Sequence, residues 1–377
     1  MAERRSIFED VSETQKPAAT PGGISRDRTR ARRLVRGWLK ILFALVVVMV
    51  AVGGLTRLTD SGLSITEWAP LSGAIPPLSE ADWQAEFEAY RAIPEYQLQN
   101  RGMSMAEFQV IYWWEWGHRQ LGRFIGLVWA VGFLGLLVTR NIPRGWSLRL
   151  LMLGALGGAQ GAIGWWMVAS GLEEGMLDVA SYRLATHLGL AFLILSLIAW
   201  YVMRLGRAES ELLAARREGD RKLKGVSTGV MHLAFLQIIV GALVAGIDAG
   251  RNYTDWPLMA GGFTPPGMWA IEPVWRNLFE NDGTVQFIHR MLGYLVLLMG
   301  LVAWVMALRS ARKATRGAFH DMMAMLVVQV AIGIMTVMAS APWYMAILHQ
   351  VGAVLLMVLI LRARFLSMYP LKQSIRG

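Results

Sequence analysis

Cysteine is absent from this chain of 377 residues, which excludes disulfide bonds, thiolate metal sites and a cysteine nucleophile. Charged residues are also scarce, at 17% of the chain, whereas 55% of the residues are hydrophobic. We expect no cleavable signal peptide, because a polar, arginine-rich segment precedes the first apolar run. What remains is a set of long apolar runs that need a membrane around them.

These apolar runs reach the roughly 18–25 residues that are needed to cross the hydrocarbon core of a bilayer. The net charge of +10 comes from lysines and arginines that gather in alternate loops, as the positive-inside rule describes. This distribution predicts that both termini are cytoplasmic, and it argues against a nucleic-acid partner. The sequence therefore predicts an all-α integral membrane protein with eight transmembrane helices, near residues 36–55, 119–139, 148–169, 184–204, 226–246, 285–307, 318–339 and 344–363.

An internal repeat organises these predicted helices. Four predicted spans separate the two copies, an even number, so both copies have the same orientation in the membrane. We therefore expect two pseudo-symmetric four-helix bundles. The matching segments are Asp60-Ser61-Gly62 with Asp248-Ala249-Gly250, His118-Arg119-Gln120-Leu121-Gly122 with His289-Arg290-Met291-Leu292-Gly293, Gln160 and Gly164 with Gln329 and Gly333, and His187 with His349.

The repeat and the hydropathy together predict the domain division. It consists of a disordered cytoplasmic tail (1–35), an N-terminal four-helix half (36–204), a cytoplasmic linker (205–225), a C-terminal four-helix half (226–364) and a second cytoplasmic tail (365–377). In the long outer loop, segments 79–91 and 104–116 are typical of short amphipathic helices on the membrane surface.

Four of the six histidines lie at matched depths. His118, His187, His289 and His349 all fall within about two turns of the outward end of a predicted span. Two histidines on different helices of one bundle suit axial ligation of a heme iron, whereas bare zinc or copper usually needs a third or fourth ligand. Simple hydrogen bonding between helices is the alternative, which four matched positions disfavour. His232 and His320 lie elsewhere and are interpreted as structural.

The two copies differ in chemistry beside these histidines. Glu115 precedes His118 by three residues and shares its helical face, whereas the second copy has Gln286 at that place. We expect Glu115 to lie part-buried beside an apolar wall and to exchange protons; the alternative is an interfacial glutamate whose carboxylate reaches water. Three nearby arginines suit either pairing with porphyrin propionates or anchoring at the membrane interface; they are Arg119, Arg123 and Arg290.

The motifs Gly53-Gly54-Leu55-Thr56-Arg57-Leu58-Thr59-Asp60-Ser61-Gly62-Leu63-Ser64 and Glu115-x-x-His118-Arg119 closely resemble those of heme A synthase. The resemblance covers nearly the whole chain after residue 35. It implies an oxidoreductase of the bacterial inner membrane that oxidises the C8 methyl of heme O to a formyl group by successive hydroxylations. The cysteine-free, tryptophan-rich form is similar to that of proteobacteria and mitochondria.

The resemblance also implies a role for each half. His289 and His349 would hold the iron of a resident heme b, while Glu115, as the catalytic group, and His118 and His187 would form the substrate site. The implied partners are heme O, membrane lipid, the heme O synthase (protoheme farnesyltransferase) that supplies the substrate, and an electron donor that the sequence does not identify. Self-association into a homo-oligomer stays open.

Two other classes of protein carry some of these features. A di-heme transmembrane electron carrier of the cytochrome b561 type also uses histidine pairs, but it typically places its hemes near both membrane faces. A duplicated transporter would explain the repeat, yet such proteins usually show broken helices or charges at the midplane. The predicted spans show little of either feature.

Overall fold

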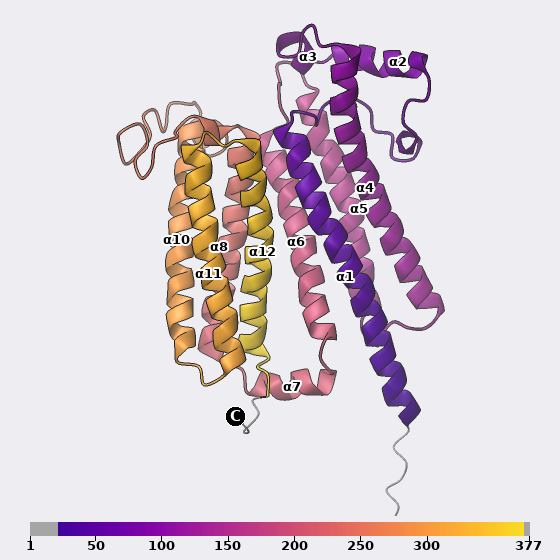
Figure 1. The fold of residues 1–377 in the computed structure, drawn as a ribbon, viewed down its shortest axis with the longest axis vertical. Helices are drawn as coiled ribbons and strands as arrows, with labels where there is room; N and C mark the ends of the chain where they lie inside the picture. Colours follow the sequence, from indigo (N-terminus) through magenta and orange to yellow (C-terminus); the bar gives the residue numbers. More distant parts are fainter. Residues whose placement is uncertain (1–21, 373–377) are drawn as a thin grey trace, which may run out of the picture.

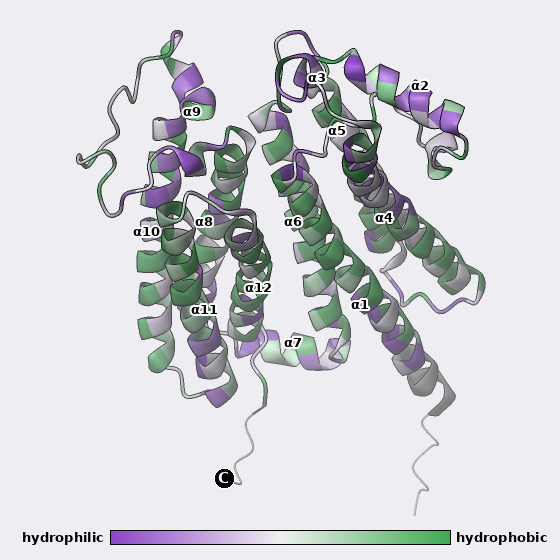
Figure 2. Ribbon diagram, turned by 45° about the horizontal axis from the view of Figure 1, so that its top comes forward, coloured by the Kyte–Doolittle hydropathy of each residue, from purple (hydrophilic) through white to green (hydrophobic). Residues whose placement is uncertain are grey.

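A computed structural model describes residues 22–372. Within that range the chain is helical and forms no β-sheet, apart from an isolated bridge between Met259 and Gly262. Eight of the described helices are long and apolar enough to cross a membrane, and Figure 2 shows hydrophobic residues along their lengths and hydrophilic ones on α2 and α7. The predicted all-α fold with eight spans is confirmed.

The eight long helices form two groups of four (Figure 1). The first group consists of α1 (Gly22–Leu58), α4 (Met105–Val138), α5 (Ser147–Gly171) and α6 (Ser181–Leu205). The second consists of α8 (Arg221–Gly246), α10 (Asp282–Leu308), α11 (Lys313–Met338) and α12 (Trp343–Met368). A short helix, α7 (Glu209–Arg217), links the groups at one end, which we call the α7 end.

The two groups meet where α6 packs against α8 and α1 packs against α12. At the second contact Gln350 donates a hydrogen bond from Nε2 to the main-chain oxygen of Val50, at 2.7 Å. Gly54 lies against the same side chain, and a Cβ atom there would be 2.7 Å from Oε1 of Gln350. The absence of a side chain at Gly54 therefore lets the two halves approach closely.

The long helices extend beyond the ends of several predicted spans. α1 begins at Gly22, well before the predicted start at 36, and α12 continues to Met368. Residues 1–21 of the predicted N-terminal tail, and 373–377 of the C-terminal one, lie outside the described residues.

The loop end of the molecule, opposite the α7 end, contains α2 (Glu80–Arg91), α3 (Pro94–Leu98) and the start of α4. The predicted helix over 79–91 is confirmed by α2, but the separate surface helix over 104–116 is wrong. Ser104 and Glu107 form a capping box, and no proline follows before Pro143, so α4 runs unbroken for 34 residues. At about 1.5 Å per residue this is about 51 Å, more than the ~30 Å hydrocarbon core, so α4 extends beyond it.

Aromatic side chains join α2, α3 and the protruding part of α4 into a small core. Phe87 stacks on Phe108 with ring centroids 4.9 Å apart. Tyr90 of α2 is fully buried and contacts aromatic rings of α3 and α4. Glu95 is buried there too, where it accepts hydrogen bonds from Tyr90 and Asn100. Burial raises the pKa of Glu95 to about 8, so this core carries little charge near neutral pH.

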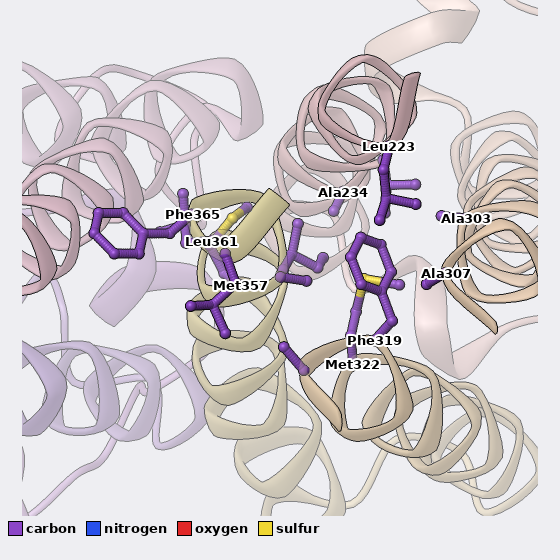
Figure 3. Close-up of a cluster of buried hydrophobic side chains, with 14 of the residues drawn as sticks. Leu223, Ala234, Ala303, Ala307, Phe319, Met322, Met357, Leu361 and Phe365 are labelled. Atoms are coloured by element: carbon purple, nitrogen blue, oxygen red, sulfur yellow. The ribbon is translucent and has the colours of Figure 1, made fainter. Parts of the chain in front are cut away.

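The core of the second half, part of which Figure 3 shows, is built from the starts of α8 and α11 and the ends of α10 and α12, which lie toward the α7 end. Leu223 comes from the first turn of α8, Phe319 from the first turns of α11, and Phe365 from the last turns of α12. Van der Waals packing holds such a core, because lipid chains are as apolar as the side chains themselves. Apolar side chains thus fill one end of the bundle and leave the loop end for polar groups. The other buried residues labelled in this core are Ala234, Ala303, Ala307, Met322, Met357 and Leu361.

Candidate functional site

The four matched histidines lie on four helices toward the loop end of the molecule. His187, His289 and His349 come within the first turns of α6, α10 and α12. His118 lies farther from the start of its helix, because α4 begins in the protruding part of the molecule. All four are half-buried, whereas His232 and His320 are exposed. His320 accepts a hydrogen bond from Trp304 at 2.9 Å, which supports its structural interpretation.

The histidines of the second half face each other across the bundle. The ring centroids of His289 and His349 are 6.4 Å apart, with an interplanar angle of 75°. Two metal–nitrogen bonds of about 2 Å, plus roughly 1 Å from each nitrogen to its ring centre, require a separation of about 6 Å. The pair therefore has the spacing of two axial ligands on one metal ion.

A glycine on the preceding helix makes room for each histidine ring. A Cβ atom at Gly164, Gly241 or Gly333 would lie 2.9 Å from Cε1 of the adjacent ring. These glycines face His187, His289 and His349 respectively, and Gly53 of α1 similarly faces His118. The rings therefore pack close to helix backbone, which sets their depth in the bundle.

Three glutamines hold three of these rings. Each lies one turn before the glycine and donates from Nε2 to the main-chain oxygen of its histidine, at 2.8–2.9 Å. The same nitrogen lies 3.1–3.3 Å from Nδ1 of the ring, and that of Gln237 also lies 3.2 Å from Nε2 of His289. The Oε1 atom of each glutamine is buried and has no hydrogen-bond partner among the described residues. The glutamines are Gln160 beside His187, Gln237 beside His289 and Gln329 beside His349.

Glu115 is more deeply buried than the sequence predicted, at 2% exposure, and polar groups surround it. Its Oε2 accepts hydrogen bonds from the Ser64 hydroxyl at 2.7 Å and from the Ile65 backbone N–H at 2.8 Å. Its Oε1 accepts from Arg119, at 2.7 Å from Nη2 and 3.1 Å from Nε. All four of these atoms, which come from three residues, are donors. The carboxylate therefore fastens the turn after α1 to α4.

Gln286 occupies the same place in the second half with the opposite hydrogen-bond pattern. Its Nε2 donates to the main-chain oxygens of Ala249 and Tyr253, at 2.8 and 3.1 Å, and its Oε1 accepts from Arg290. The loop of the second half thus presents carbonyls where the loop of the first half presents N–H and O–H groups. Each residue matches its own loop.

The three arginines bind loops at the loop end of the molecule. Arg119 donates to the main-chain oxygens of Ile65 and Glu67, and Arg123 to those of Ala69 and Pro70. The guanidinium of Arg290 donates to three loop carbonyls, those of Tyr253, Asp255 and Leu258. The loops are therefore tied to the helices that carry His118 and His289.

Several of these contacts were not anticipated from the sequence. The contacts of Gln237 and Gly241 with His289 were not predicted. The alignment of the two copies that pairs Asp60 with Asp248 also pairs Gly53 with Gly241, and would have pointed to this glycine. Ser64 is part of the motif Gly53–Ser64, but nothing in its pattern indicated a bond to Glu115.

The residues present fit a heme between histidine pairs. The His289–His349 spacing suits two axial bonds, and the orphaned glutamine oxygens lie beside the rings as acceptors. Among residues 22–372, no three His, Cys, Asp or Glu side chains gather as a site for a bare metal ion. Two histidines per half, on different helices, are a ligand set that heme iron takes in helical bundles.

Comparisons with known proteins agree with this site. The family of cytochrome oxidase assembly proteins matches residues 36–361. The chain is 70% identical over 377 residues to a heme A synthase of Jannaschia sp. (strain CCS1), which covers all of both chains. It is 66% identical over 380 residues to the heme A synthase of Dinoroseobacter shibae, covering 100% of this chain and 99% of the relative. The identity to that of Paracoccus denitrificans is 58% over 376 residues, 99% of each chain.

Identity at this level along the full length, together with the four histidines and eight spans, confirms the resemblance seen in the motifs. The chain belongs to the heme A synthase family of cytochrome oxidase assembly proteins.

Proposed function

We propose that this protein converts heme O to heme A with a division of labour between its halves. Membership of the heme A synthase family carries the conversion itself. The observation that supports the division is the contrast beside the two matched histidines: Glu115 with its donors in one half, and Gln286 with its carbonyls in the other. Only the first half offers an ionisable side chain there.

The second half is the site of the resident cofactor in this proposal. His289 and His349 would hold heme b, and Gln237 and Gln329 fix both rings. A heme with two histidine ligands supplies a one-electron redox centre and leaves no open position for oxygen. This half would therefore pass electrons from an external donor to the other half.

The first half is the substrate site in this proposal. His118 and His187 would hold heme O. Glu115 lies one turn from His118, and its carboxylate would take up or release a proton, while the Ser64 hydroxyl, 2.7 Å from Oε2, holds the carboxylate in place. Arg119 would stabilise the negative charge that this carboxylate carries between proton transfers.

The arginines serve chiefly as loop anchors in this proposal. Each already donates to loop carbonyls, so a propionate would have to share or displace those bonds. By fastening the loops over the histidine layer, they exclude water from both sites. The other partners follow from the reaction: a heme O synthase upstream, a single-electron donor, and surrounding lipid.

The direct test is heme analysis. Expression in a host that makes heme O but has no heme A synthase should yield heme A in extracted membranes, and the same host with an empty vector should yield heme O alone. A di-heme carrier would leave the heme pool unchanged. That alternative is also disfavoured because all four histidines lie toward one end of the bundle.

We further propose that the α7 end is cytoplasmic in the bacterial inner membrane, with both termini inside. Reporter fusions at residues 210 and 313, both at the α7 end, should give cytoplasmic signals. Fusions at 90 and 265, at the loop end, should give periplasmic ones, because arginines and lysines concentrate at the α7 end. Reversal at any of the four positions would contradict this orientation.

A further inference from the structure

The glycine that faces each histidine is preceded, one helical turn earlier, by glutamine in three cases and by methionine in the fourth. Gln160, Gln237 and Gln329 precede Gly164, Gly241 and Gly333. Met49 precedes Gly53, which faces His118. His118 is thus the only one of the four matched histidines whose preceding helix offers no amide at this position.

Met49 occupies the same place in its half as Gln237 does in the other. The two residues approach the matching glycines of the His-Arg-x-Leu-Gly repeat. A Cβ atom at Gly122 would lie 3.5 Å from the methyl of Met49, and one at Gly293 would lie 3.2 Å from Nε2 of Gln237. The difference is therefore one of side-chain chemistry rather than of backbone position.

The ring of His118 also has a different orientation. It presents Nε2 toward Gly53, at 3.0 Å from a Cβ atom there, whereas the other three rings present Cε1 to their glycines. A methionine thioether is at best a weak acceptor and cannot donate a hydrogen bond, so it fixes neither ring nitrogen. The one ring with a different orientation is therefore the one that has no amide beside it.

An amide beside the ring matters for metal ligation. A histidine that binds iron through Nε2 carries its proton on Nδ1, and that N–H needs an acceptor. Each of the three glutamines has a buried Oε1 without a partner among the described residues. Rotation of the amide about its last bond would present Oε1 to Nδ1–H, while the histidine carbonyl keeps its bond within the helix.

We propose that Gln160, Gln237 and Gln329 are positioning residues that fix three heme-ligating histidines, and that Met49 leaves His118 free to turn as the exchangeable ligand. The inference rests on the proposed division between a resident and a substrate heme. The resident site then has two fixed ligands and retains its heme. The substrate site has one fixed ligand, His187, and one that can let go, which suits a site that must admit heme O and release heme A.

The first arm of the test removes an amide from the resident site. Gln237→Met should speed the loss of heme b from purified protein to excess apomyoglobin by about tenfold or more, because such supporting contacts typically contribute 10–100-fold to metal affinity. The matched control is Gln350→Met. Gln350 lies next to His349 in the chain, but bonds to Val50 and to no ring. Its heme b should leave at the wild-type rate.

The second arm adds an amide to the substrate site. Met49→Gln, which nearly conserves side-chain volume, should slow the release of heme O and heme A by about tenfold and raise the amount that copurifies. Met49→Leu cannot donate or accept a hydrogen bond and should release heme as the wild type does. Absorption and electron paramagnetic resonance spectra should show added low-spin heme only in Met49→Gln.

The outcomes separate this inference from the proposed function. If the double variant His289→Ala/His349→Ala keeps its heme b, the division between halves is overturned. If the double variant loses heme b but Gln237→Met retains it as the wild type does, the positioning role is wrong. Release from Met49→Gln at the wild-type rate, with the protein folded and its heme b in place, would overturn the role of His118.

Discussion

Replacement of Glu115 by glutamine should abolish heme A formation and leave heme b bound. In extracts from cells that depend on the variant, heme O or a hydroxylated intermediate should accumulate. The physical reason is that glutamine matches the size of the carboxylate but cannot take up a proton. General acid–base groups typically contribute about 10²–10⁴ in rate, so the loss of heme A should be almost complete. Normal heme A levels would remove the proton-transfer role.

The structure adds a second effect that this experiment must separate. The Ser64 hydroxyl, the Ile65 N–H and Arg119 all donate to Glu115, so a glutamine NH₂ group would face another donor. An unsatisfied buried group of this kind costs about 1–3 kcal/mol. Ser64→Ala is the matched control, since it removes one loop contact and keeps the carboxylate. If Ser64→Ala lost heme A as fully as Glu115→Gln, fastening of the loop would explain the defect.

Loss of either resident ligand should remove the low-spin heme b spectrum. His289→Ala and His349→Ala each delete one of two facing rings, 6.4 Å apart, and a single remaining imidazole cannot hold the iron in a six-coordinate state. Reduced-minus-oxidised spectra and a pyridine hemochrome assay of purified protein would measure the change. His320→Ala is the control, because that ring is exposed and bonds to Trp304. A full heme b signal in the double variant His289→Ala/His349→Ala would reverse the assignment of the halves.

The fold was largely predictable because two strong signals are local in the sequence. Hydropathy located the eight spans, and the repeated His-Arg-x-Leu-Gly placed His118 and His289 at equivalent depths. A backbone in lipid must satisfy its own hydrogen bonds, so long apolar runs allow little except helices. The continuity of α4 through 104–116 was missed because tryptophans and charges there also suit a helix on the membrane surface.

The surroundings of Glu115 could not be predicted for a different reason. Its partners Ser64 and Ile65 lie some fifty residues earlier, in a turn whose N–H groups point at the carboxylate only after α1 packs on α4. Sequence spacing places Glu115 on the face of His118, but it does not say which way a distant backbone turns. The same holds for Gln237, whose contact with His289 joins residues 52 apart.

The close packing of α1 on α12 would give the two proposed heme sites a short route for electron tunnelling. Gly53 lies against His118, and its neighbour Gly54 lies against Gln350, which follows His349 in the chain. The backbone of α1 therefore lies between His118 and the residue that follows His349. Because tunnelling weakens steeply with distance, an electron in the proposed division of labour would cross between the halves where α1 packs against α12. Duplication and fusion would then have produced two redox sites held at a fixed distance in one chain, so that electron transfer between them needs no diffusional encounter of two proteins.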